Sequence, residues 1–315
     1  MTHESKHFTR IAVESGETSR SPETRYLPLL NSGAAILHEG ATFNRYTDDW
    51  GDPLRFALPE VRVSTSERWK ALIGHYKIAL RAIVGSSPEK SIAALLPPGC
   101  LVSNSALIEG TPERRLTQNS LRLIALLNAT TFSWLLSFYA DLNVNLFALK
   151  YLPVPKADLP GFLAHGALRL SCNHAGYRPL WQEQVGDAWR EGSNKDSWPV
   201  LSDDDARWAV RAQLDAVVAQ AYGLDRAQYE HVLASFSHSS YKRAPELCLA
   251  AFDELVALGL DAFTKKHDPY WDIPLVTTLP KPVLNLTGSA PTQTEPAKFV
   301  LTAPEPKAKA KRGKR

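Results

Sequence analysis

The sequence has little of what secreted, disulfide-bonded or membrane-spanning proteins require. Its 315 residues include only three cysteines, Cys100, Cys172 and Cys248, which are widely spaced and odd in number. This usage argues against a disulfide framework and fits a reducing compartment. No apolar run approaches the ~20 residues of a membrane-spanning helix, and the first ten residues carry no apolar signal region. We therefore expect a cytoplasmic protein that does not interact with membranes.

Signatures of common catalytic and metal sites are also missing. The chain contains no phosphate-binding Walker loop, no dinucleotide-binding glycine pattern and no H-E-x-x-H, G-x-S-x-G or C-x-x-C motif. We therefore predict that this chain has no catalytic residue, no metal site and no bound cofactor of its own.

The net charge of +3 is unevenly distributed along the chain. Residues 307–315 hold six basic side chains and no acid, whereas the remainder has 30 basic against 33 acidic side chains. Residues 62–160 carry 11 basic and 6 acidic side chains, and residues 200–262 carry 5 and 10. Of these two regions, residues 62–160 are expected to be able to approach phosphates, whereas residues 200–262 are expected to be repelled by them.

Hydrophobic patterning predicts a mixed α+β protein. Short strands are expected at residues 34–37, 61–64 and 91–96, and a helix is expected over residues 117–139, starting at Thr117. A second helix over 202–222 is expected to begin at an N-capping Ser202 and to end before Gly223. Two further helical segments are expected to begin after Asp225 and to run over residues 245–258.

These elements divide the chain into four regions. We expect a flexible N-terminus over residues 1–25, an α/β region over 26–160, and a mainly helical region over 161–262. Residues 263–315, which are rich in proline and lysine, are expected to form a flexible basic tail.

A protein that reads DNA needs cations for the phosphates and polar side chains for the base edges. Arg81 lies in an apolar alternation, so it either reaches solvent, pairs with an acid such as Glu89, or faces a ligand. For Lys90 as well, a structural salt bridge and a DNA contact both remain open. Polar residues in expected loops complete the set. The candidate DNA-binding residues are Arg68, Lys70, Lys77, Arg81, Lys90, Asn104, Arg114 and Arg115.

Several short motifs occur in a characteristic order. They are His38-Glu39-Gly40, Pro97-Pro98-Gly99 at the end of an apolar segment, Leu127-Asn128-Ala129, Leu152-Pro153-Val154-Pro155, and Leu214-Asp215-Ala216 followed by Tyr222-Gly223-Leu224. Together they resemble the C-terminal, target-recognition half of type IIG restriction–modification proteins. They also resemble the related adenine-specific DNA methyltransferases of BREX and DISARM phage-defence systems.

The resemblance implies recognition of double-stranded DNA without methyl transfer by these residues alone. The sequence has neither the family's cofactor-binding glycine motif nor its Asn-Pro-Pro-Tyr motif, and the family's Lys-Met pair is Ala41-Thr42 here. An arginine of the family is replaced by Lys90. S-adenosylmethionine is accordingly implied for a partner's catalytic domain, and a methyltransferase or restriction subunit is the implied protein partner.

Two alternatives remain open from the sequence. The excess of acids outside residues 307–315 favours a protein–protein scaffold of a defence complex that does not contact DNA. The other alternative is an enzyme in its own right, in which Asp268-Pro269-Tyr270-Trp271 is a degenerate methyltransferase motif.

Overall fold

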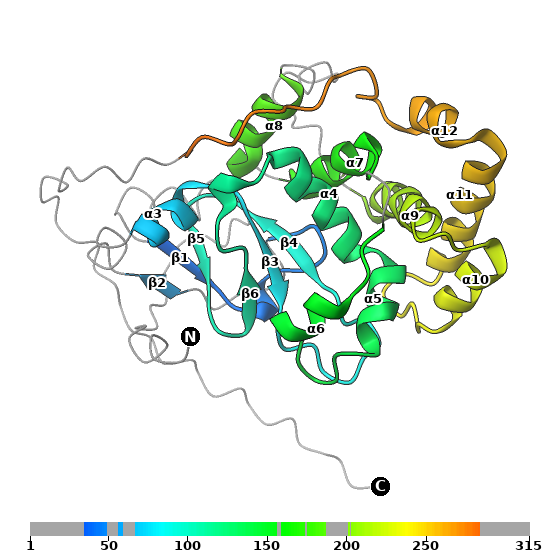
Figure 1. Cartoon of the computed structure of the whole chain (residues 1–315), viewed down its shortest axis with the longest axis horizontal. Helices are drawn as coiled ribbons and strands as arrows, with labels where there is room; N and C mark the ends of the chain where they lie inside the picture. The colour runs from blue at the N-terminus through cyan, green and yellow to red at the C-terminus, as the bar shows by residue number, and fades with distance from the viewer. Residues whose placement is uncertain are drawn as a thin grey trace, which may run out of the picture.

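The computed structural model describes residues 35–48, 56–58, 67–155, 159–173, 175–186, 201 and 203–283. Two small sheets lie on one side of the molecule, and successive helices cover them on the other (Figure 1). The expected mixed α+β class is therefore confirmed. The strand expected at residues 61–64, the N-terminus over residues 1–25 and the last part of the basic tail lie outside the described residues.

Each sheet has three strands. In the first, β1 (Ala35–His38) pairs antiparallel with β2 (Phe56–Leu58) and parallel with β5 (Cys100–Val102). In the second, β3 (Lys77–Arg81) lies between β4 (Ala93–Leu96) and β6 (Ala106–Ile108) and is antiparallel to both. All four residues of β4 are buried, which confirms the apolar run 91–96 as a core strand. Helix α3 (Glu67–Gly74) leads into β3.

The helices form layers behind the second sheet. Helix α4 packs on β3 and β4, α7 packs on α4, α9 packs on α7, and α11 packs on α9 (Figure 1). The helices are α4 (Thr117–Asn128), α5 (Thr130–Ser137), α6 (Leu146–Tyr151), α7 (Gly161–Ser171), α8 (Arg178–Val185), α9 (Asp204–Ala221), α10 (Arg226–Ala234), α11 (Ala244–Leu258) and α12 (Leu260–His267).

A glycine allows α7 and α9 to approach closely. A Cβ atom at Gly166 would lie 2.5 Å from Cδ2 of the buried Leu214 and would collide with it. The absence of a side chain at this position therefore sets the distance between two central helices.

The helix expected over residues 117–139 is divided in two. Ala129 adopts an extended conformation (φ −69°, ψ 144°), so α4 ends at Asn128 and α5 begins at Thr130. The start expected at Thr117 is confirmed, and the hydroxyl of this residue donates to Glu183 of α8 (3.1 Å). The break lets the backbone amide of Thr130 meet a carboxylate from α9, which an unbroken helix would not permit.

The ends of the C-terminal helices follow the sequence closely, with one correction. Asp203 rather than Ser202 caps α9, and its carboxylate accepts from the amide of Ala206 (2.7 Å). Gly223 follows α9 with φ +75°, as expected of a residue that ends a helix in the left-handed region. Asp225 forms a capping box at the start of α10.

The boundary predicted at residue 263 falls inside α12. Phe263 is fully buried, and the chain beyond α12 runs back over the helices toward α3 (the orange segment in Figure 1). Gln118 donates to the carbonyl of Val276 (2.9 Å), and the amide of Val283 donates to the carbonyl of Gly74 (2.8 Å). Residues 263–283 thus belong to the folded structure.

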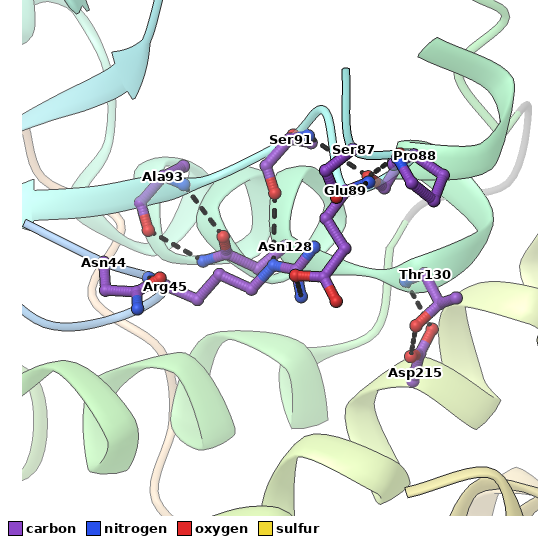
Figure 2. Close-up of polar contacts among 11 residues, drawn as sticks. Asn44, Arg45, Ser87, Pro88, Glu89, Ser91, Ala93, Asn128, Thr130 and Asp215 are labelled. Atoms are coloured by element: carbon purple, nitrogen blue, oxygen red, sulfur yellow. Dashed lines mark hydrogen bonds and ion pairs between the residues drawn. The ribbon is translucent and has the colours of Figure 1, made fainter. Parts of the chain in front are cut away.

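The second sheet and the helices are joined by a side-chain amide at the end of α4. Asn128 accepts a hydrogen bond from the amide of Ala93 and donates one to its carbonyl, both at 2.9 Å (Figure 2). The same carbonyl accepts from the backbone amide of Tyr46 (3.0 Å). Because β4 is an edge strand, Asn128 supplies the pairing that a further strand would otherwise provide.

Further polar contacts extend this junction in both directions. Arg45 donates to the carbonyl of Ser91 (3.1 Å), and the amide of Ser91 donates to the hydroxyl of Ser133 in α5 (3.1 Å). On the other side, Asp215 of α9 accepts from the backbone amide (2.9 Å) and the hydroxyl of Thr130 (Figure 2). Sheet, α4, α5 and α9 are therefore fixed to one another by hydrogen bonds as well as by apolar packing.

We predict that Asn128→Leu lowers the free energy of unfolding by about 2–4 kcal/mol, because it leaves the buried amide of Ala93 without a partner. Urea unfolding measures this change. Asn119→Leu, on the same helix, serves as the control, because the Asn119 side chain is exposed and accepts a hydrogen bond from Arg122 (3.0 Å). Equal losses in the two variants would contradict the role assigned to Asn128.

Candidate nucleic-acid interface

Lys77, one of the candidate DNA contacts, lies inside the protein. Its side chain is fully buried, and Nζ donates to the carbonyls of His75 (2.9 Å) and Pro97 (3.2 Å). Burial lowers the pKa of the Lys77 ammonium to about 8. This corrects its assignment, because a phosphate could reach Nζ only after the sheet had opened.

The side chains of Lys90 and Arg81 likewise donate hydrogen bonds to backbone carbonyls. Lys90 is 5% exposed, and its Nζ donates to the carbonyls of Gly85 (2.7 Å) and Asp141. Arg81 donates twice to the carbonyl of Phe43, once through Nε at 3.0 Å. Both alternatives for Lys90, a salt bridge and a direct DNA contact, are therefore wrong. Its described partners are backbone carbonyl oxygens.

The other candidates do not form one face with these residues. Asn104 is exposed in the turn between β5 and β6, and Arg114 is exposed 3.6 Å from Glu113. Arg115 pairs with Glu109 through Nε (3.3 Å). Arg68 and Lys70 lie on α3, but their side chains are outside the description. Among the candidates whose side chains are described, Lys77 and Lys90 are therefore too deeply buried to contribute to a cationic surface.

A different group of cations surrounds the turn at residues 43–47. Arg45 belongs to this turn, Arg81 donates to its Phe43 carbonyl, and Arg207 of α9 donates to the hydroxyl of Thr47 (3.3 Å) and to the carbonyl of Leu170 (3.0 Å). A fourth arginine lies one helical turn beyond Arg207. We call this group the arginine collar; its members are Arg45, Arg81, Arg207 and Arg211.

Arg211, the fourth member of the collar, lies over the ring of an aromatic side chain. Its guanidinium carbon lies 3.7 Å from the ring centroid of Trp208, which stacks on Tyr241 at 4.9 Å. No carboxylate of the described residues forms an ion pair with it. Burial, and then repulsion by Arg45, lower the pKa of Arg211 to about 10. It therefore remains charged at neutral pH.

Few acids offset the charge of the collar. Glu89 lies 3.5 Å from Arg45, and Asp215 already accepts two hydrogen bonds from Thr130. Burial raises the pKa of Asp215, which shows that the collar only partly stabilises its charged form. With Asp204, which attracts Arg207, three described carboxylates act on the four guanidinium groups and leave an excess of positive charge, and guanidinium groups bind phosphate oxygens well.

Sequence reasoning missed Arg207 and Arg211 because residues 200–262 are acidic overall. The spacing of the two arginines was the available signal. Residues four apart lie on one face of a helix, and these two continue toward the buried positions Leu214 and Val218. The acids at the start of α9, including Asp204 and Asp205, are exposed.

The described ranges contain neither a metal-binding cluster nor a membrane-spanning helix. Within them, no three His, Cys, Asp or Glu side chains lie close enough together to hold a metal ion. No helix in the same ranges has both the length and the apolar character needed to cross a membrane.

Known proteins provide no further guide to the site. No protein-family model matches the chain. No curated protein and no solved structure matches it either. The interpretation therefore depends on the geometry and on the sequence motifs.

The buried Lys77 predicts a specific pH dependence of stability. Its folded pKa of about 8 lies below the ordinary 10.5, so the unfolded chain binds more protons between these values. Stability should therefore rise with pH through this window, and Lys77→Met should remove that rise. Between about pH 7.5 and 9.5, the wild type should gain roughly 2 kcal/mol relative to the variant in urea unfolding. Parallel pH profiles of the two proteins would refute this prediction.

Proposed function

We propose that this chain is the DNA-recognition part of an adenine-specific DNA methyltransferase in a restriction–modification or phage-defence system. It holds double-stranded DNA while a catalytic domain outside these 315 residues, supplied with S-adenosylmethionine, modifies the base. The observation that carries the DNA-binding part is the arginine collar, and within it the half-buried Arg211, which forms no ion pair with a described carboxylate.

The motif residues support the proposal in a different way. Asn128 and Asp215 both lie within the motifs that carry the resemblance. Asn128 forms hydrogen bonds with Ala93, and Asp215 accepts one from Thr130, so the two side chains join the sheet to the helices. The shared motifs therefore encode a common frame. In such a module, sequence specificity resides in exposed side chains of loops, where variation does not disturb the core.

The proposal divides the contacts into two kinds. Arginines of the collar contact phosphate oxygens, which fixes the position of the duplex without reading its sequence. Exposed side chains such as Asn104 and Arg114 are suited to base edges, because an amide pairs with adenine and a guanidinium pairs with guanine.

We predict that Arg207→Gln combined with Arg211→Gln lowers the affinity for a mixed-sequence duplex by at least about tenfold at about 50 mM salt. The slope of log affinity against log salt should also become shallower by about two, because two phosphate contacts are lost. Fluorescence anisotropy with a labelled duplex measures both quantities.

Arg226→Gln is the matched control, because Arg226 is an exposed arginine of α10 that pairs with Asp253 (2.9 Å). It should bind DNA like the wild type. Binding unchanged in the double variant, or equally weakened in the control, would contradict the assignment of the collar to DNA.

A second candidate function, a protein–protein scaffold, is favoured by exposed apolar side chains near α6. Phe138, Phe147 and Tyr151 are 66%, 68% and 58% exposed, and the rings of Phe147 and Tyr151 lie 4.8 Å apart. Exposed aromatic residues are typical of the central part of protein interfaces. A scaffold would use this surface to bind the catalytic subunit and would not contact DNA.

The two functions predict different behaviour of Phe147→Ser combined with Tyr151→Ser. For a scaffold, the wild type binds no duplex even at low salt, and this variant loses its complex with the co-expressed methyltransferase subunit. For the DNA-recognition part, the variant keeps the DNA affinity of the wild type. Size-exclusion chromatography and anisotropy on the same preparations distinguish these outcomes.

A further inference from the structure

A cavity of about 410 Å³ lies between the start of α7 and α12, and none of its lining residues belongs to the arginine collar. One wall is apolar and includes Phe162 and Leu275, while the polar part contains His165 and Asp268. Its volume lies within the range of small-molecule sites, which is about 300–1,000 Å³.

His165 is held in one orientation at this cavity. Its Nδ1 lies 2.7 Å from Oδ2 of Asp268, and the backbone amide of Tyr270 donates to Oδ1 of the same carboxylate (2.9 Å). A carboxylate is an acceptor, so Nδ1 carries the proton of this hydrogen bond. In the neutral imidazole, Nε2 is then an acceptor.

Nε2 of His165 is the unexplained atom at this site. The His165 side chain is 4% exposed, and Nε2 has no hydrogen-bond partner among the described residues. Polar atoms that are buried in this way are normally paired, so an unpaired acceptor on a residue that lines a cavity indicates a missing donor.

The exposed rim of the cavity supplies an aromatic surface and one charge of each sign, while the remaining carboxylate, Asp268, is buried and bonded to His165. Trp271 is 50% exposed and lies beside Lys265, whose Nζ is 5.3 Å from the centroid of its ring. Asp261 and Lys265 lie one turn apart on α12, so their opposite charges balance. This arrangement favours an uncharged planar ligand over an ion.

We propose that the cavity binds a small, neutral heteroaromatic molecule that carries a ring N–H group. The ring packs against Trp271 and the apolar wall, and the N–H donates to Nε2 of His165. This inference goes beyond DNA recognition and does not depend on it, because it rests on a separate group of residues.

Indole and 1-methylindole test the proposal on the full chain without any mutation. The two probes have almost the same shape, but only indole has an N–H donor. Isothermal titration calorimetry should show saturable binding of indole with a Kd below about 1 mM, as suits so small a ligand. 1-Methylindole should bind at least about fivefold more weakly, because the hydrogen bond to Nε2 is lost. No indole binding, or equal affinities, would overturn the proposal.

A pair of tryptophan variants locates the binding. Trp271→Leu, at the cavity rim, should weaken indole binding at least about fivefold, because the stacking surface is removed. Trp134→Leu is the control, since Trp134 packs on Phe138 outside the cavity. It should leave the Kd unchanged. Retention of binding in Trp271→Leu would overturn the proposal even if indole bound elsewhere on the chain.

Discussion

The pairing of Asn128 with both backbone groups of Ala93 is the contact on which the rest of the structure depends. It completes the free edge of β4 with a side chain rather than a strand, so the second sheet can end against a helix. Because α4 stops at this asparagine, Thr130 begins a new helix at the position where Asp215 can hold it. The position of α9, and with it that of Arg207 and Arg211, follows from this sequence of contacts.

The cations of the α/β region illustrate how a small sheet uses charge. Turns leave carbonyl oxygens that no strand can pair, and long basic side chains can reach them. Lys77, Lys90 and Arg81 donate hydrogen bonds to five different carbonyl oxygens. The burial of Lys77 lowers the pKa of its ammonium group. The charges of Lys77 and Lys90 therefore serve the fold, and they could not be taken as evidence for a phosphate-binding surface.

The arginine collar and the His165 cavity differ in the kind of ligand they suit. The collar combines half-buried guanidinium groups with too few carboxylates, which favours a polyanion. The cavity combines a fixed acceptor, an aromatic rim and balanced charges, which favours a neutral molecule. The Asp268-Pro269-Tyr270-Trp271 motif lies at the cavity, but Asp268 is engaged with His165 and with the Tyr270 amide. In this arrangement its carboxylate orients another side chain.

The sequence alone predicts those elements that depend on interactions between residues close together in the chain. The apolar run of β4, the glycine after α9 and the capping box of Asp225 all act within a few residues, so the chain alone reveals them. The break at Ala129 and the burial of Lys77 depend on partners distant in sequence, Asp215 for the first and Pro97 for the second. The collar likewise joins a turn near residue 45 to a helix more than 150 residues later. Only the tertiary structure decided these features, because a charge or a hydrogen-bonding group acquires its role from whatever the fold places within a few ångströms of it.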